Sequence, residues 1–269
     1  MRLPSTVKLL AAGLVVSLSG TSMAAQPQGD KPSADDVAQR QSMDSFTSLE
    51  DGQPSDPGEL EFQLDLAWST TSSESDPGFW VSQIKYTPDG SDFLRNMKLA
   101  VTTPFEIGNG GIDGNGDAEF EWQQRWLAED GDAPTVATIF SLRVPSGYQS
   151  DGIDGTFTAI IAKDMGPGTF FFNGWGKSAN GDNIEDRRDF QWGGRLAYLW
   201  RFDEDAALTI DYVHQTSEMN GESNVNLLEL GAQFVIDESL TIGPGVFVGL
   251  DGRETTPNFG AGIRITYGF

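Results

Sequence analysis

The sequence contains no cysteine, so neither disulfide bonds nor thiolate metal ligands can contribute to its fold or to a site. It contains a single histidine, His214, and any catalysis by an imidazole must therefore depend on that residue. Beyond the first 25 residues, no run of roughly 18 apolar residues occurs. These absences exclude a disulfide scaffold, a thiolate metal centre and a membrane protein built from helices.

Basic residues are also few, with 17 Lys and Arg against 40 Asp and Glu and a formal net charge of −23 at pH 7. Such a chain repels the phosphates of nucleic acid, which excludes DNA or RNA as a partner. One interpretation is an acidic surface that keeps the protein soluble in a saline habitat. If acidic loops instead face anionic lipopolysaccharide, they need divalent cations or high salt to screen the repulsion.

The first 25 residues have the pattern of a Sec-type signal peptide. Arg2 and Lys8 precede an apolar run from Leu9 to Leu18, and small residues follow at Ser22 to Ala25. Removal of this segment would leave 15 of the 17 Lys and Arg residues and all 40 acids. We therefore expect export, with residues 1–25 as the signal peptide.

Residues 26–58 are polar and acidic and contain several prolines. This composition predicts a disordered periplasmic leader, because its apolar content cannot offset the entropy of ordering the chain. A short helix that plugs a larger structure is the alternative, and its sparse apolar residues would be Val37, Met43, Phe46 and Leu49.

Residues 59–269 have the strict alternation of β-strands. In the last strand, one face carries large apolar residues up to a terminal aromatic, and the other carries small or polar residues, namely Phe259, Ala261, Ile263, Ile265, Tyr267 and Phe269 against Gly260, Gly262, Arg264, Thr266 and Gly268. This pattern is typical of the closing strand of an outer-membrane β-barrel, where one face meets lipid and the other a polar lumen. We also expect the barrel-assembly machinery to recognise this strand, which ends at Phe269.

The connections between the predicted strands alternate in length. The short ones are Pro88–Asp92, Glu129–Ala133, Asp164–Gly168, Asp203–Asp205 and Asp237–Ser239, and the long ones are centred on Ser72–Pro77, Gly108–Gly116, Ser146–Gly155, Ser178–Arg188, Glu218–Asn224 and Asp251–Pro257. Short periplasmic turns alternating with long external loops are typical of outer-membrane barrels. The sequence thus predicts an all-β, transmembrane antiparallel barrel of about twelve strands in the outer membrane of a Gram-negative bacterium, with both termini periplasmic.

The outer face of the predicted barrel would contact lipid, and this contact leads to two further predictions. Six tryptophans fall near predicted strand ends, where their rings would anchor at the level of the lipid headgroups: Trp68, Trp80, Trp122, Trp126, Trp192 and Trp200. Pro244 removes one donor from the strand ladder, and we expect a local bulge there. Outer-membrane lipid and lipopolysaccharide are accordingly the expected surroundings.

The charged residues that parity assigns to the lumen are the candidates for function. They are Glu61, Asp65, Lys85, Lys98, Glu119, Glu121, Arg125, Arg143, Arg195, Arg201, Asp211, Glu229 and Arg264. Both signs occur at similar depths, so these residues either pair across the lumen and close it or line a narrow, selective passage. Antiparallel pairing of the first and last strands predicts that Arg264 pairs with Asp65 or, one step lower, with Glu61.

Four segments resemble the outer-membrane transporters grouped with the meta-pathway of phenol degradation. They are Leu99–Phe105, Gly114–Asp117, Arg125–Gly131 and Leu142–Gly147, of which the Gly-x-Gly-Asp and Val-Pro-Ser-Gly pair is the most specific, and the similarity extends over residues 59–269. The resemblance implies a barrel for the passage of small, often aromatic, organic solutes, and it supplies no catalytic motif or cofactor.

Two further patterns suggest other functions. Asp113–Asp117, followed by Glu119, has oxygen ligands at alternate positions as a calcium loop does, although a tight external loop uses the same residues. His214 lies on a predicted lipid face with Thr216 two residues on, which would suit an outer-membrane hydrolase; the alternative is an interfacial histidine beside Tyr212. We predict a channel rather than an enzyme. The alternatives are a hydrolase that uses His214 and a closed structural barrel with acidic surface loops.

Overall fold

A computed structural model describes residues 51–70, 75–108, 111–115, 117–146, 152–178, 188–217, 220–221, 223–250 and 259–269. The predicted signal peptide, residues 1–25, and residues 26–50 of the predicted leader lie outside the described residues. The elements are β1 (Leu60–Thr70), β2 (Ser75–Tyr86), α3 (Asp92–Arg95), β3 (Met97–Gly108), β4 (Gly111–Asn115), β5 (Ala118–Leu127), β6 (Thr135–Val144), β7 (Asp154–Met165), β8 (Gly168–Ser178), β9 (Phe190–Asp203), β10 (Ala206–Gln215), β11 (Val225–Asp237), β12 (Leu240–Gly249) and β13 (Phe259–Gly268).

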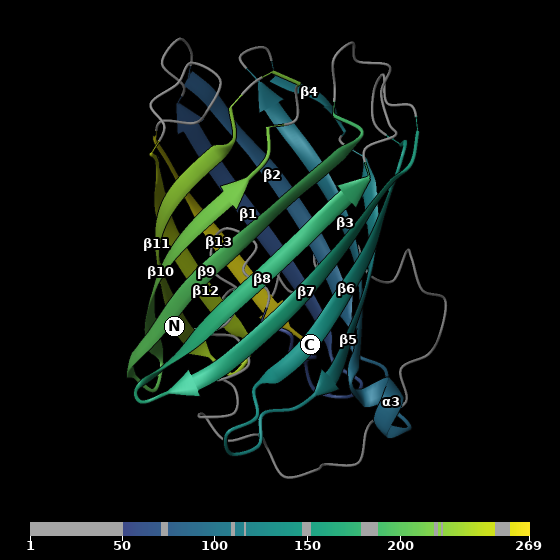
Figure 1. Cartoon of the computed structure of the whole chain (residues 1–269), viewed down its shortest axis with the longest axis vertical. Helices are drawn as coiled ribbons and strands as arrows, with labels where there is room; N and C mark the ends of the chain where they lie inside the picture. The colour runs from purple at the N-terminus through teal and green to yellow at the C-terminus, as the bar shows by residue number, and fades with distance from the viewer. Residues whose placement is uncertain are drawn as a thin grey trace, which may run out of the picture. The chain divides into compact units, whose positions relative to one another are not determined.

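These strands form one closed antiparallel sheet (Figure 1), in which β1 pairs with both β2 and β13. Strand β4 pairs with one end of β3, and β5 pairs with the other end. The two therefore act as segments of a single barrel strand, and the barrel has the twelve strands that the sequence predicts. The structure differs from the prediction at Gly108–Gly116, which was expected to be a loop: Gly111–Asn115 within this segment forms strand β4.

The two ends of the barrel chain meet at the rim that carries the short turns. The backbone N–H of Phe269 donates to the carbonyl of Leu60 at 2.9 Å, and Asp65 lies opposite Arg264 in the register of β1 and β13. The tight turns at residues 166–167, 204–205 and 238–239 lie at this same rim, as the alternation of connections predicts. The loop Asp251–Pro257 lies outside the described residues.

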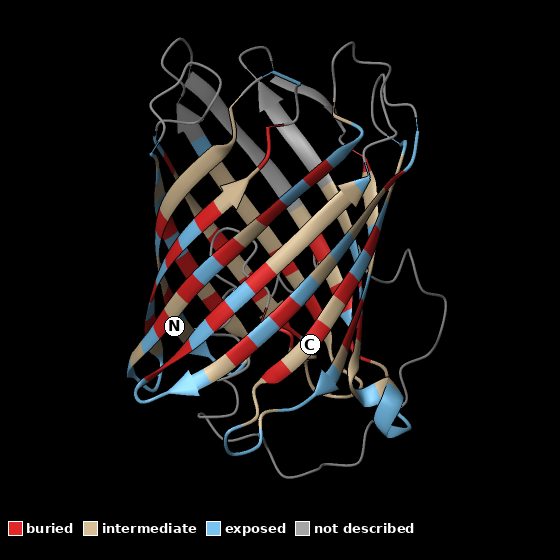
Figure 2. Cartoon of the chain, viewed as in Figure 1, coloured by how far each residue is buried: buried red, intermediate tan, exposed pale blue. Residues whose placement is uncertain are grey.

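Burial alternates along the strands in the way a membrane barrel requires (Figure 2). On β9, Trp192, Leu196 and Trp200 are exposed, whereas Arg195 and Leu199 between them are buried. The exposed face is apolar on nearly every strand, which identifies it as the lipid-facing side. Five of the six predicted interfacial tryptophans are exposed, and the side chain of Trp80 lies outside the described part. No helix among the described residues is long and apolar enough to cross a membrane.

The bulge expected at Pro244 does not occur. Pairing of β11 with β12 stops between Gly231 and Phe234 and resumes in the same register, and Pro244 stays opposite Ile263 on β13. The proline therefore interrupts the hydrogen bonds between β11 and β12 without shifting their register. It removes one backbone donor, whereas a bulge requires an extra residue in one strand. The register shift on β11 falls instead between Val235 and Asp237, next to the turn.

Residues 51–58 differ from the disordered leader that the sequence predicts. The N–H of Gly58 donates to the carbonyl of Thr87 at 2.8 Å, and Asp51 and Gly52 are both buried. Gly52 has a φ of 73°, and a Cβ there would lie 2.9 Å from the Cβ of Ala137 and 3.1 Å from Cγ2 of Ile160. The end of the leader thus enters the barrel and contacts its inner wall.

Candidate functional site: the barrel lumen

The charged residues predicted for the lumen all lie at buried or half-buried positions of the strands. The buried ones are Glu61, Lys85, Lys98, Arg195, Asp211, Glu229 and Arg264, and the half-buried ones are Asp65, Glu119, Glu121, Arg125, Arg143 and Arg201. Not one of them is on the exposed face. Their placement follows from strand geometry, because side chains two residues apart along a strand point to the same face of the sheet.

The seam between β1 and β13 contains the ion pair that the sequence predicts. Nε of Arg264 donates to Oδ1 of Asp65 at 2.7 Å, and an Nη atom donates to Oδ2 at 3.3 Å. On the neighbouring strand, Nζ of Lys85 lies 3.1 Å from Oε1 of Glu61. Strand β1 thus forms one ion pair with β13 and another with β2, and each pair neutralises a charge that burial would otherwise penalise.

Replacing Arg264 with alanine should shift the ion preference of the barrel toward cations, because the carboxylate of Asp65 loses its guanidinium partner. The loss of stability should be a few kcal/mol if the carboxylate is desolvated and under about 1 kcal/mol if the lumen is wet. The reversal potential in a KCl gradient measures the preference. Arg95→Ala is the control, since Arg95 is exposed on α3 outside the strands. An unchanged reversal potential in Arg264→Ala would contradict the prediction.

A second buried cluster joins three strands. An Nη atom of Arg195 on β9 lies 3.1 Å from Oε2 of Glu229 on β11, and its Nε lies 3.8 Å from Oδ1 of Asp211 on β10. Asp211 and Glu229 are opposite each other in the register of their strands. One guanidinium thus pairs with two buried acidic side chains that lie on facing strand positions and would otherwise repel each other when both are charged.

A third cluster lies at the strand ends away from the short turns. Arg143 pairs with Asp154 and lies 3.6 Å from Asp117, and Nζ of Lys177 lies 3.6 Å from Asp154. Asp117 also accepts a hydrogen bond from the backbone N–H of Ser146 at 3.1 Å. Its carboxylate is therefore engaged by protein groups. The described residues contain no group of three acidic or histidine side chains placed to hold a metal ion. The side chains of Asp113 and Asn115 lie outside the described part, so the calcium loop stays a prediction.

A cavity of about 450 Å³ occupies the half of the lumen away from the short turns. Strands β5 to β10 supply its lining residues, which are Glu119, Glu121, Ile139, Ser141, Thr156, Thr158, Asn173, Trp175, Lys177, Arg195 and Gln215. The indole of Trp175 lies across Gly193, where a Cβ would be only 2.3 Å from the ring. The cavity therefore combines an aromatic surface, hydroxyl and amide groups and charges of both signs.

Asn173, Trp175 and Lys177 are lining residues that the sequence reasoning missed. They alternate on β8 with Phe172, Gly174 and Gly176, and the polar ends of this series mark the lumen face. The large aromatic in the middle of the series obscures the alternation. Gly193, which lies opposite Trp175 on β9, leaves room for a large ring on the inner face. This glycine is the feature of the sequence that could have predicted an inward-facing Trp175.

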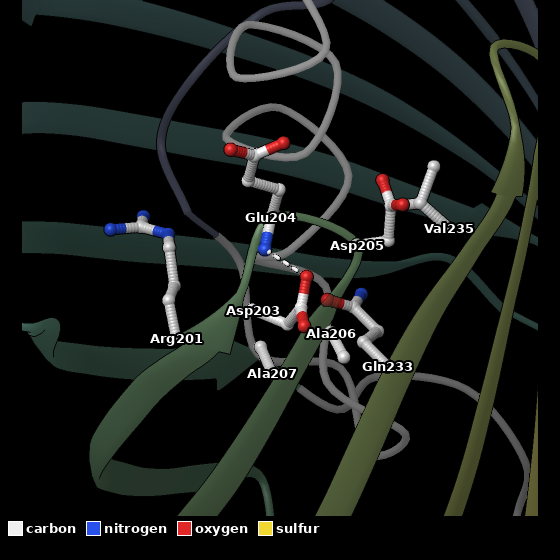
Figure 3. A pocket seen from close by; sticks show the side chains of 8 residues that line it. All are labelled: Arg201, Asp203, Glu204, Asp205, Ala206, Ala207, Gln233 and Val235. Carbon is white, nitrogen blue, oxygen red and sulfur yellow. Dashed lines mark hydrogen bonds between the residues drawn. The ribbon is translucent and has the colours of Figure 1, made fainter.

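A much smaller pocket lies beside the turn between β9 and β10 (Figure 3). It has a volume of about 10 Å³, and Arg201, Asp203 and Gln233 are among its lining residues. The N–H of Glu204 donates to Oδ1 of Asp203 at 2.7 Å within the turn. The pocket has space for about one water molecule and is too small for an organic solute.

His214 lies on the outer face of β10, half-buried, in a group of interfacial side chains. Its Nδ1 lies 2.7 Å from Oδ1 of Asn226, which also accepts a hydrogen bond from the hydroxyl of Tyr212 at 2.6 Å, and the ring of Trp192 is 5.3 Å away. The hydroxyl of Thr216 hydrogen-bonds instead with the backbone N–H and C=O of Trp192. Within the described residues, His214 and Thr216 form no hydrogen bond with each other.

Several solved outer-membrane barrels have the same fold. The COG4313 outer membrane channel from Pseudomonas putida F1 superposes with a TM-score of 0.64 at 14% identity, over 81% of this chain and 98% of that one. The KdgM porin gives a TM-score of 0.51 at 9% identity, over 77% and 99%, and the NanC porin gives 0.51 at 10%, over 77% and 98%. The sequence matches no model of a known protein family and no curated protein.

Proposed function

We propose that this protein is an outer-membrane channel for the passive, selective passage of small organic molecules. The observation that carries the proposal is the mixed aromatic and polar cavity of about 450 Å³ inside a barrel whose outer face is apolar. Two lining cations, Arg195 and Lys177, are held in ion pairs with acids of the wall. The fold is that of proteins called channels and porins, which supports the same function.

The resemblance to the phenol-degradation transporters adds aromatic compounds to the proposed solutes. The indole of Trp175 provides a flat apolar surface in the cavity, and offset stacking of aromatic rings contributes about 0.5–1.5 kcal/mol beyond burial of area. The remaining lining groups would hydrogen-bond to hydroxyl or carboxylate substituents. A small aromatic alcohol or acid therefore fits the chemistry of the wall.

Two measurements on the purified full-length protein test this function. Single-channel recording in a planar bilayer should give discrete conductance steps, whereas a closed structural barrel would give none. Liposome swelling should then be faster with p-hydroxybenzoate than with an aliphatic acid of similar size, and Trp175→Ala should remove this difference. Equal swelling rates with the unaltered protein would contradict the aromatic preference but leave the channel intact.

Replacing His214 with alanine should leave conductance and swelling rates unchanged. The side chain lies on the outer face, where it contacts Asn226 and Trp192 rather than the lumen. Ester hydrolysis by the same preparation would be measured on a phospholipid substrate. Hydrolysis that the unaltered protein performs and His214→Ala lacks would instead favour the hydrolase.

A further inference from the structure

Separate parts of the cavity wall carry charges of opposite sign. Glu119 and Glu121 line the cavity from β5, whereas Lys177 lines it from β8 and Arg195 from β9. From β5 to β9 there are four strand spacings, or about 19 Å along the sheet. A solute in the cavity therefore meets an acidic part of the wall on β5 and a basic part on β8 and β9.

On the basic side, Arg195 has donor groups that the protein does not use. Its side chain is only 6% exposed, and its Nε lies 3.8 Å from Asp211, which is beyond hydrogen-bond range. One Nη atom pairs with Glu229, but Nε and the other Nη atom have no hydrogen-bond partner in the described part of the chain. Leaving a buried charged donor without an acceptor is costly, and a carboxylate oxygen is a strong acceptor for a guanidinium. Arg195 is therefore suited to bind a carboxylate that enters the cavity.

On the acidic side, Glu119 has a carboxylate without a counter-charge. The side chain is half-buried, and within the described residues it forms neither an ion pair nor a hydrogen bond. Arg143 lies opposite Glu119 in the register of β5 and β6, but it pairs with Asp154 instead. An ammonium group of a solute would supply the missing positive charge.

We propose that the cavity selects small aromatic zwitterions, with the carboxylate on Arg195, the ring against Trp175 and the ammonium group on Glu119. Its volume of about 450 Å³ is in the range of pockets that bind small organic ligands. A solute with one charge would leave either Arg195 or Glu119 without a partner. The separation of the two parts of the wall favours a solute whose charges lie at opposite ends of its ring. This inference rests on the proposed channel function and names the class of solute for its cavity.

Three para-substituted probes that differ in their charged groups test this selection. The zwitterion is 4-(aminomethyl)benzoate, whereas 4-methylbenzoate lacks the ammonium group and 4-methylbenzylamine lacks the carboxylate. Isothermal titration calorimetry with the full-length protein in detergent micelles at neutral pH measures the three affinities. We expect the zwitterion to bind about tenfold more tightly than either of the others, because it forms one more charge-assisted hydrogen bond.

Glu119→Gln removes the negative charge with little change of shape, and it breaks no ion pair of the described residues. It should weaken binding of the zwitterion about tenfold without weakening binding of 4-methylbenzoate, so the preference between these two probes should disappear. Glu204→Gln is the matched control, because Glu204 is exposed in the turn between β9 and β10, and it should keep the preference. Arg195→Lys should weaken binding of both carboxylates but not of 4-methylbenzylamine, since lysine lacks the planar set of donors.

Equal affinities for the three probes in the unaltered protein would overturn the inference. An unchanged preference for the zwitterion in Glu119→Gln would overturn it as well, because Glu119 would then not bind the ammonium group. Either result would leave the proposed channel function intact. Conversely, selective binding of the zwitterion by a barrel that gives no conductance steps in a planar bilayer would contradict the channel and support the binding site.

Discussion

Replacing Arg195 with leucine should lower the free energy of unfolding by about 3–5 kcal/mol. The leucine leaves the carboxyl groups of Asp211 and Glu229 buried on facing strand positions without the guanidinium that pairs with both. Uncompensated charges of the same sign in a region of low dielectric constant repel strongly. The midpoint of guanidinium unfolding in detergent micelles, followed by tryptophan fluorescence, measures the loss.

Arg201→Leu is the matched control on the same strand. Its guanidinium lies 3.9 Å from Asp164 near the rim, and both side chains are partly exposed, so its removal should cost under about 1 kcal/mol. The double variant Arg195→Leu and Glu229→Gln should recover part of the stability, because one of the two carboxylates is then neutral. Equal losses for Arg195→Leu and Arg201→Leu would show that the buried cluster is well hydrated.

Replacing Gly193 with alanine should both destabilise the barrel and change its conductance. The new Cβ would lie 2.3 Å from Cζ2 of Trp175 and 2.7 Å from the carbonyl oxygen of His214. Overpacking of this kind typically costs about 1–3 kcal/mol. The indole can relieve the clash only by moving into the cavity, and we expect the conductance to fall.

Gly194 provides a control one residue away. A Cβ there would face the other side of the sheet, 3.6 Å from the nearest atom, so Gly194→Ala should change stability by less than about 0.5 kcal/mol and leave the conductance unaltered. In Gly193→Ala combined with Trp175→Ala, the conductance should recover because the displaced ring is gone. A conductance that stays low in the double variant would show that backbone distortion, rather than the indole, narrows the passage.

The period of two in the sequence predicts most of this architecture. Alternation places the charged residues on the inner face, and the antiparallel closure of the first and last strands brings Arg264 to Asp65, 199 positions apart. Such pairs are predictable because the register of a closed barrel is fixed by its turns and its termini.

Contacts that depend on residues outside the alternation are not predictable in this way. The buried position of Gly52 depends on a left-handed backbone conformation and on the absence of a side chain at Gly52 itself, where a Cβ would crowd Ala137 and Ile160. Nothing in the polar composition of residues 51–58 indicates burial. The inward orientation of Trp175 is also not predictable from the alternation, because it depends on the space left by Gly193 opposite it rather than on the hydrophobicity of the tryptophan.

The glycines of the lumen wall divide into two kinds with different evolutionary freedom. A side chain at Gly193 or Gly260 would collide with an aromatic ring and a backbone carbonyl, so selection can change these positions only with compensating mutations. At Gly231 and Gly243, a Cβ would meet no atom closer than 3.4 Å. Single mutations at these two sites could add bulk or charge to the lumen while leaving the lipid face and the strand register intact. A lineage facing new solutes could therefore diversify its permeability through neutral steps at these sites.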